Sequence, residues 1–298
     1  MKKSILFLAL CFFQGFYAQN SEIFKLKNYR TAILSDSIQE NSGLTFFNGK
    51  LFTINDSGNA PILFEIDKNK GKINQIFKIK QENRDWEAVT CDSTHIYIGD
   101  FGNNTGTRKD LRIIKINFKD QHNNVASKKN ELNGDILPFY YPEQTDFSSR
   151  NLNTDFDAEA MIYLDGKLHI FTKEWHSKLS THYILDPNNQ EIQAAQKIET
   201  YPTGFVISDA FYYQKKLYTV GYTKKTEVFL AIFEESESGI FFKQKPKQFY
   251  LGSALAVGQI EGISVDEYGI YISSEIFQTP INKPRPYFYF IPKDKLKL

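Results

Sequence analysis

Cysteine is nearly absent from this 298-residue sequence, which contains only Cys11 and Cys91. Cys11 lies in an N-terminal stretch that has the character of a removable leader. Cys91 is then alone, so no disulfide can form within the remaining chain. We interpret Cys91 as a small buried apolar residue beside a strand and not as a nucleophile.

An excess of charge of one sign is also missing. The chain has 36 Lys and Arg residues against 35 Asp and Glu residues. Removing Lys2 and Lys3 with the leader leaves 34 against 35, a net charge of about −1. This balance gives no indication of a nucleic acid or an anionic membrane as the partner. Beyond the N-terminal stretch no apolar run is long enough for a membrane helix, so we expect no stable membrane insertion.

Several familiar catalytic signatures are missing too. The sequence has no Gly-x-Ser-x-Gly elbow, no Walker phosphate loop, no His-Glu-x-x-His and no Cys-x-x-Cys. The five histidines do not cluster along the chain. Any catalysis would therefore depend on a metal ion with acidic partners.

Residues 1–19 have the pattern of a secretory signal peptide. A basic start at Met1-Lys2-Lys3 is followed by the apolar run Ile5–Phe13 and by a small residue, Ala18, near the boundary. The pattern predicts export to the periplasm or the cell exterior. It also predicts a mature chain of residues 20–298, a length that fits a single domain.

A short phrase recurs five times along the mature chain. Nine residues after one polar residue in each copy, an aliphatic residue begins an alternating apolar segment. The polar residues are Ser42, Glu87, Glu159, Ser208 and Glu261, and the aliphatic residues are Leu51, Ile96, Leu168, Leu217 and Ile270. The segments are short and rich in Phe, Tyr, Ile and Val, which is typical of strands.

Each copy is predicted to be a hairpin. Turn residues separate the two apolar segments in three copies, as Asn48-Gly49, Asp165-Gly166 and Tyr268-Gly269. Further strand-like runs follow every copy, among them Ile240–Phe242 and Tyr287–Ile291, giving about four strands per copy.

Five such repeats predict an all-β fold, a β-propeller with four-stranded antiparallel blades. The intervals between positions 42, 87, 159, 208 and 261 are 45, 72, 49 and 53 residues. The repeats favour five blades, while the long second interval leaves room for a sixth, degenerate one. The last copy has too few strands, so we expect the N-terminal segment Phe24–Leu34 to complete its blade and close the ring.

The repeated polar residues are candidate metal ligands. If the first strand of each hairpin is innermost, Ser42, Glu87, Glu159, Ser208 and Glu261 surround the axis at one level. Three carboxylates in a partly dry tunnel would raise one another's pKa or bind a cation. Oxygen ligands without His or Cys favour Ca²⁺. The alternative is that the glutamates accept hydrogen bonds from strand N–H groups and bind no metal.

A second set of polar residues is predicted at the mouth, where the second strands end. The candidate catalytic carboxylates are Asp56, Asp100 and Asp209. Loop 100–108 combines glycines with Asn, Thr and Arg donors suited to phosphate or sugar oxygens. The candidate substrate-binding residues are Arg84, Trp86, Asn103, Asn104, Arg108, Lys173, Glu174 and His176. The same rim is predicted to contain Asp85, Asp157, Trp175, Tyr222 and Glu275.

The order Ser, Glu, Glu, Ser, Glu resembles the calcium-activated nucleotidases, or soluble apyrases, which are five-bladed propellers with Ca²⁺ in the central tunnel. Ser42-Gly43-Leu44 with Asn55-Asp56-Ser57-Gly58 is similar to their first blade, and Trp86-Glu87-Ala88-Val89 to their second. The family's nucleotide-clamping loops have no match beyond Asp56. Phytase-like, esterase-like and gluconolactonase-type propellers share the Glu-Gly-Ile phrase seen at Glu261.

Two classes of function stay open from the sequence. The first is a secreted Ca²⁺-dependent hydrolase of a small anionic substrate, which would be a phosphate ester, a phosphoanhydride or a lactone. The second is a non-catalytic module that binds an envelope ligand and uses calcium structurally.

Overall fold

A computed structural model describes residues 21–119, 131–277 and 285–296 of the chain. The predicted signal peptide, residues 1–19, lies outside the described residues, as does Cys11. Within the part of the chain that is described, no helix has the length and apolar character needed to cross a membrane.

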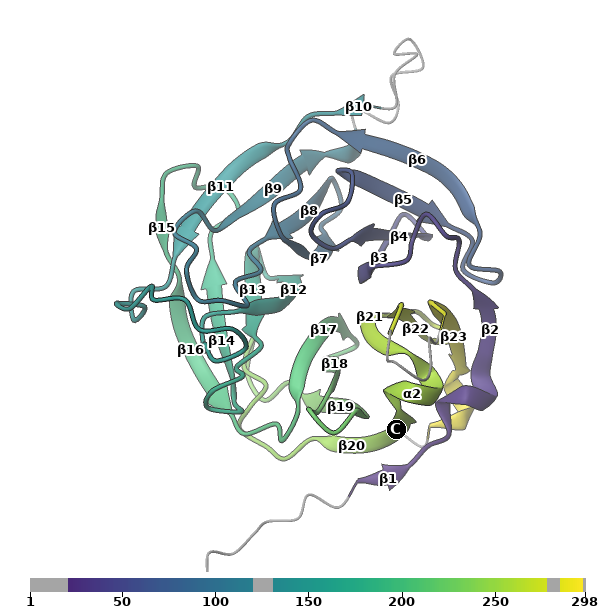
Figure 1. Cartoon of the computed structure of the whole chain (residues 1–298). Coiled ribbons are helices and arrows are strands. Elements are labelled where there is room, and N and C mark those ends of the chain that lie inside the picture. Colours follow the sequence, from purple (N-terminus) through teal and green to yellow (C-terminus); the bar gives the residue numbers. More distant parts are fainter. Residues whose placement is uncertain (1–20, 120–130, 278–284, 297–298) are drawn as a thin grey trace, which may run out of the picture.

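Five antiparallel sheets stand around a common axis as the blades of a propeller (Figure 1). Their innermost strands are β3 (Asn41–Phe47), β7 (Trp86–Cys91), β12 (Ala158–Leu164), β17 (Val206–Tyr213) and β21 (Gln259–Val265). The second strands are β4 (Lys50–Asn55), β8 (His95–Asp100), β13 (Lys167–Thr172), β18 (Lys216–Tyr222) and β22 (Gly269–Glu275). The prediction that each repeat begins a blade at its inner hairpin is confirmed.

Two outer strands complete each blade. The third strands are β5 (Ile62–Ile66), β9 (Arg112–Asn117), β14 (Ser180–Leu185), β19 (Glu227–Glu234) and β23 (Tyr287–Pro292). The fourth are β6 (Ile73–Ile79), β11 (Asp135–Tyr140), β16 (Gln196–Tyr201), β20 (Lys247–Ser253) and β2 (Arg30–Ile33). The long second interval adds no sixth blade among the described residues. Its extra length includes the short strand β10 (Glu131–Leu132) and the connection between β11 and β12.

The N-terminal segment closes the ring. Strand β2 pairs antiparallel with β23, so the last blade takes its outermost strand from the start of the chain, as predicted. The preceding strand β1 (Glu22–Ile23) pairs parallel with β20 of the fourth blade, and η1 (Leu26–Tyr29) connects the two strands. The segment therefore holds two blades together.

Short parallel strands also occur on two other blades. β10 pairs with β6, and β15 (Gln193–Ala194) pairs with β11. In each case a residue pair from the chain of the next blade extends the outer edge of the blade before it. This arrangement covers edge N–H and C=O groups that would otherwise be unpaired. Two further short helices are α2 (Ala254–Val257) and η2 (Lys293–Lys295).

The hairpin turns follow their residues in two of the three predicted cases. Asn48 and Gly49 have φ values of 49° and 75°, and Asp165 and Gly166 have 48° and 77°. Positive φ at both central residues matches a type I′ turn. The third prediction is wrong in detail, because Val265 pairs with Ile270 and the loop spans four residues. There the Asp266 carboxylate accepts hydrogen bonds from the amides of Tyr268 and Gly269.

One predicted strand is absent. Ile240–Phe242 does not join the fourth blade, whose outer strand is β20. Ile240 forms an isolated bridge with Glu237, while the amides of Phe241 and Phe242 donate to the Glu199 carboxylate of β16. The apolar character of this segment instead reflects burial between blades, since Phe241 and Phe242 pack in the cluster between the third and fourth blades.

Blades contact one another through large apolar side chains. Between the first two blades, Phe47, Phe52 and Phe77 all meet Phe118 edge to face, with ring centroids 5.1 to 5.3 Å apart. Such pairs stabilise the fold beyond the burial of their area by about 0.5–1.5 kcal/mol each. Cys91 ends β7 and is half-buried, and its thiol donates to the Phe46 carbonyl.

Candidate functional site

A cavity of about 270 Å³ lies among the ends of the innermost and second strands. Asp56 follows β4, Lys173 follows β13, and Tyr222 and Glu275 end β18 and β22. These side chains come from four blades. The full lining is Asn41, Ser42, Asp56, Glu87, Asn104, Leu152, Glu159, Lys173, Trp175, Tyr222, Gln259, Glu261 and Glu275.

A bulge interrupts the ladder of every innermost strand at the repeated phrase. The pairing skips Glu87, Glu159, Ser208 and Glu261, and in the first blade it skips Gly43, the neighbour of Ser42. A bulge re-aims a side chain. The skipped glutamates all line the cavity. The repeated phrase in the sequence therefore marks the β-bulge of each innermost strand, and three of these bulges place a glutamate in the cavity lining.

The two repeated serines connect blades. Ser42 Oγ donates to the Glu87 carbonyl at 2.7 Å, and Ser208 Oγ donates to the Ile260 carbonyl at 2.6 Å. Ser42 still lines the cavity, whereas Ser208 is fully buried outside its lining. The structure thus brings four of the five predicted metal ligands to one cavity and gives Ser208 a different contact.

Negative charge dominates the cavity. Five carboxylates line it, and Lys173 is the one cationic side chain in the lining. Burial, with repulsion from neighbouring carboxylates, raises the pKa of Glu87, Glu159 and Glu275 well above the usual value. Burial also raises the pKa of Asp56 and Glu261. Such a set favours the binding of a cation.

Lys173 neutralises part of this charge. Its Nζ lies 2.8 Å from Glu159 Oε1, and the ring centroids of Trp175 and Tyr222 lie 5.6 and 5.4 Å from the ammonium. Burial alone would lower the pKa of Lys173, but Glu159, Tyr222 and other neighbouring acids hold it well above its usual value. The lysine therefore stays charged.

The third ring carboxylate, Glu261, is also partnered. Its Oε1 accepts hydrogen bonds from Tyr222 at 3.0 Å and from the Gln259 amide at 2.7 Å. Its Oε2 is buried and has no hydrogen-bond partner among the described residues. Gln259 was not predicted from the sequence, although it stands two residues before Glu261 and so belongs to the last repeat. Asn41, also unpredicted, bonds Thr53 and Ser273.

Glu87 has two aspartates as neighbours. One oxygen of Glu87 and one from each of Asp56 and Asp85 lie within 4.8 Å of one another. Of the three predicted catalytic aspartates, Asp56 alone lies in the cavity lining.

Two aspartates predicted at the rim have raised pKa values. For Asp85, burial raises the pKa to about 6. Asp157, another predicted rim residue, is fully buried, and its pKa is raised to about 7 by burial.

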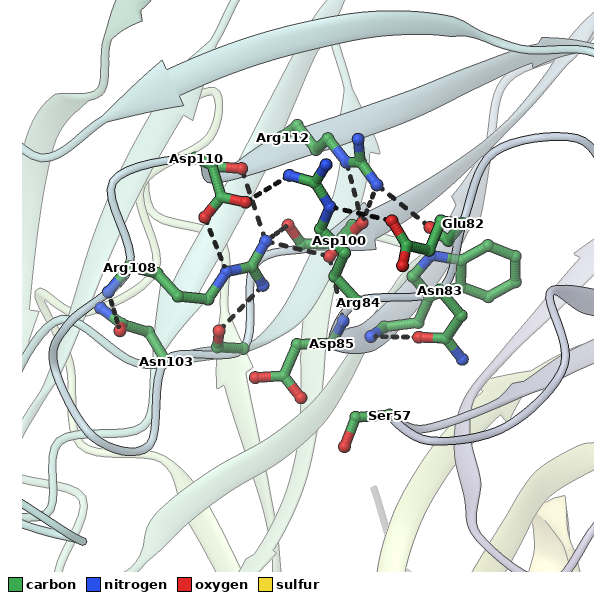
Figure 2. A network of polar contacts seen from close by, with 12 residues as sticks. Ser57, Glu82, Asn83, Arg84, Asp85, Asp100, Asn103, Arg108, Asp110 and Arg112 are labelled. Atoms are coloured by element: carbon green, nitrogen blue, oxygen red, sulfur yellow. Dashed lines mark hydrogen bonds and ion pairs between the residues drawn. The ribbon is translucent and has the colours of Figure 1, made fainter.

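Asp100 does not lie at the open rim. It is fully buried, and its two oxygens contact Arg108 at 3.1 Å and Arg112 at 2.7 Å (Figure 2). Asp100 Oδ1 also accepts a hydrogen bond from the Asp85 amide at 3.1 Å. A carboxylate held by two arginines has a structural task, so Asp100 is not available to activate water.

Asp209 is likewise inside the propeller. Its Oδ2 accepts hydrogen bonds from the amides of Ile263 at 2.7 Å and Leu44 at 3.2 Å, and its Oδ1 accepts one from Ala210 at 2.8 Å. The carboxylate joins β17 to β21 and β3. It is fully buried and lies outside the lining of the axial cavity.

Several predicted substrate-binding residues have other partners. Arg84 is exposed and pairs with Glu82 and Asp110, and Arg108 pairs with Asp100 and Asp110. Four more predicted binding residues lie outside the cavity lining. Trp86 is in the core, and Asn103 bonds Asp157. Glu174 bonds Thr172, and His176 lines a separate surface pocket. Of the predicted binding set, Asn104 and Lys173 line the cavity.

Comparisons with known proteins agree on the fold. No protein-family model matches the chain, and no curated protein matches it. The chain is similar to the exo-β-1,3-galactanase of Phanerochaete chrysosporium, with 9% identity and a TM-score of 0.54 over 89% of this chain and 64% of the galactanase. It is also similar to a GH43 β-1,3-galactosidase, with 9% identity and a TM-score of 0.51 over 89% of this chain and 94% of the galactosidase.

A protein described as a 6-phosphogluconolactonase from Bacteroides uniformis has 10% identity and a TM-score of 0.40, over 87% of this chain and 71% of its own. At these identities the likeness concerns the fold alone. The chain is a five-bladed β-propeller with an acidic cavity on its axis.

Proposed function

We propose that this propeller binds Ca²⁺ at its axial cavity and hydrolyses a small, oxygen-rich anionic substrate there, a phosphate ester, a phosphoanhydride or a lactone. The observation that carries the proposal is the charge of the cavity: five lining carboxylates face one lysine. The resemblance of the repeated residues to the calcium-activated nucleotidases supports the same assignment.

The residues present fit calcium. The cavity offers carboxylate, hydroxyl and amide oxygens, which are the ligands of hard cations, and its lining contains no His or Cys. Glu87 is almost fully buried, and no donor among the described residues bonds its carboxylate. A buried carboxylate without a partner is costly, so a cation would relieve the cost.

Each group of lining residues has its own role in the proposed hydrolysis. A bound cation supplies polarisation of the substrate oxygen. Asp56 is half-buried at the cavity wall and orients water as the candidate base. Lys173 supplies positive charge near the substrate anion, and Trp175 and Tyr222 form an aromatic wall.

A second candidate is a non-catalytic module that binds an envelope ligand around a structural cation. The observation that favours it is that the two arginines of the predicted binding set are already paired with carboxylates of the protein. Arg84 and Arg108, which a hydrolase of phosphates would use on its substrate, already pair with carboxylates. A neutral, hydroxyl-rich ligand needs no arginine.

Calcium should control both stability and turnover. Ligand at a hundred times its dissociation constant adds about 2.7 kcal/mol to the folded state, so CaCl₂ should raise the melting temperature and a chelator should lower it. Hydrolysis of nucleoside di- or triphosphates, a phosphate monoester or a lactone should require the added Ca²⁺. Asp56→Asn, assayed at a Ca²⁺ concentration that saturates the variant, should lower kcat by about a hundredfold or more, because it removes the candidate base.

The control for this experiment is Asp36→Asn, which changes an exposed aspartate paired with Arg285. It should leave both turnover and the calcium-dependent melt as in the wild type. A folded, calcium-loaded protein without turnover on these substrate classes would contradict the hydrolase and favour the binding module.

We also propose that the protein is exported, because residues 1–19 combine a basic start, an apolar core and a small residue before the boundary. Mass spectrometry of the exported protein should find a mature N-terminus near Gln19. An exported protein that retains Met1 would contradict a cleaved signal peptide.

A further inference from the structure

Three carboxylates meet between the first two blades, at the side of the axial cavity. Asp56 directly follows β4, Asp85 directly precedes β7, and Glu87 lies within β7. One oxygen from each lies within 4.8 Å of the others. Glu87 is buried, with an exposed fraction of 3%, while Asp56 and Asp85 are half-buried. Asp56 and Glu87 also line the axial cavity.

Backbone hydrogen bonds fix these residues independently of their carboxylates. The Asn83 side-chain amide donates to the Asn55 and Asp56 carbonyls at 3.1 and 2.8 Å, which joins the two loops. The Asp85 amide donates to Asp100, and the Asp85 carbonyl accepts from Gly102 at 3.1 Å. The loops therefore hold the three carboxylates together although their charges repel one another.

Among the described residues, the nearby arginines form no ion pair with this group. Figure 2 shows Arg84 and Asp85 pointing in opposite directions, with the Asp85 carboxylate on the side of Ser57. Arg84 pairs with Glu82 and Asp110. The charge of the three carboxylates thus has no ion-pair partner among the described residues.

A second observation points to a ligand. The Glu87 carboxylate is almost fully buried and accepts no hydrogen bond from the described residues. The backbone of Gly102 lies against it: a Cβ on Gly102 would lie 2.3 Å from Glu87 Oε1 and 2.5 Å from Asp85 Oδ2. A bare glycine thus keeps this space free of side-chain atoms.

The other two ring glutamates differ in this respect. Glu159 has Lys173 as its ion-pair partner, and Glu261 accepts hydrogen bonds from Tyr222 and Gln259. Among the three ring glutamates, Glu87 is therefore the one whose carboxylate has neither an ion-pair partner nor a hydrogen-bond donor among the described residues.

We propose that Asp56, Asp85 and Glu87 form a site for a divalent cation of the calcium class, off the propeller axis and at the border of the cavity. Oxygen-only ligands exclude the soft-ligand metals, and three carboxylates provide the charge that a hard cation needs. This inference rests on the proposed function for the use of its cation. It deepens that function, because a cation here borders the cavity through Asp56 and Glu87 and can meet a phosphate or lactone oxygen of the substrate.

Calcium titration by calorimetry tests the site. We expect Asp85→Asn to weaken Ca²⁺ binding by about tenfold or more, the range typical for disturbed metal sites. Asp85 is the best position because its amide bond to Asp100 and its carbonyl bond from Gly102 use the backbone and persist in asparagine. Asp110→Asn, which removes a nearby charge paired with Arg84 and Arg108, should stay within about threefold of the wild type.

Two more variants locate the ion. Gly102→Ala places a methyl group against Glu87 and should also weaken Ca²⁺ binding, without changing any charge. Glu261→Gln should retain the wild-type affinity. The site is overturned if Glu261→Gln loses calcium while Asp85→Asn keeps it, since the ion then lies on the axis. A folded wild type that binds no Ca²⁺ overturns the site as well.

The outcome for the proposed hydrolase is separate. Loss of Ca²⁺ binding in Asp85→Asn supports the site even if the calcium-loaded wild type hydrolyses none of the substrates. In that case the cation site stands and the hydrolase fails. Circular dichroism of each variant with and without CaCl₂ verifies that the affinities are compared between folded proteins.

Discussion

Replacing Asp209 with alanine is expected to lower the free energy of unfolding by at least about 3 kcal/mol. The substitution removes the acceptor of three buried amide groups, those of Leu44, Ala210 and Ile263. A buried donor left without a partner costs about 1–3 kcal/mol. The loss is large because one carboxylate connects the innermost strands of three blades.

Urea unfolding of Asp209→Ala, Asp209→Asn and the wild type measures this effect. Asparagine keeps one acceptor oxygen, so its loss should be smaller than that of alanine. Asp294→Ala, an exposed change beside Lys295, should leave the midpoint unchanged. A wild-type midpoint for Asp209→Ala would contradict the structural role of the carboxylate. A loss of turnover without loss of stability would restore Asp209 as a catalytic candidate.

The blade count and the inner hairpins could be predicted from the sequence because their signals are local. A nine-residue spacing and an Asn-Gly or Asp-Gly turn both lie within one hairpin. The outer strands are less regular. Strand β16 (Gln196–Tyr201) is mostly polar, so its apolar pattern is weak, and the apolar segment Ile240–Phe242 packs between blades without pairing in the sheet.

Some residues of the site could also be predicted from the sequence, because the repeat is a local signal. The repeat gives the positions that reach the axis, and Glu87, Glu159 and Glu261 do line the cavity. What each side chain contacts depends on distant segments. Asp100 receives its arginines from the loop after β8 and from β9, and Asp209 receives amides from two other blades. Such partners leave no local pattern, so the sequence alone does not distinguish Asp100 and Asp209 from Asp56.

Lys173→Met is expected to destabilise the protein by about 3–5 kcal/mol at neutral pH, the usual cost of removing one partner from a buried ion pair. Lys173 lies 2.8 Å from Glu159, and both side chains are less than a tenth exposed. Methionine keeps much of the packing against Trp175 and Tyr222 but supplies no charge. Glu159 would then be a buried carboxylate without a counter-ion.

The pH dependence identifies the charge as the cause. Burial already raises the pKa of Glu159 well above its unfolded value, and Lys173 opposes that rise. Without the lysine the folded-state pKa rises further. The penalty is then full above the folded-state pKa and falls as pH decreases toward the unfolded value near 4.3. The difference in unfolding free energy between variant and wild type should therefore be smaller at pH 5 than at pH 8.

Lys178→Met provides the control, because Lys178 is exposed and its backbone amide alone bonds Glu174. Urea unfolding of both variants and the wild type at the two pH values, in the presence of chelator, gives the comparison. An equal loss for Lys173→Met at both pH values would assign the cost to the packing of the lysine chain against the aromatic rings. A smaller loss at pH 5 assigns it to Glu159, and so identifies Lys173 as the internal counter-ion of the axial carboxylates.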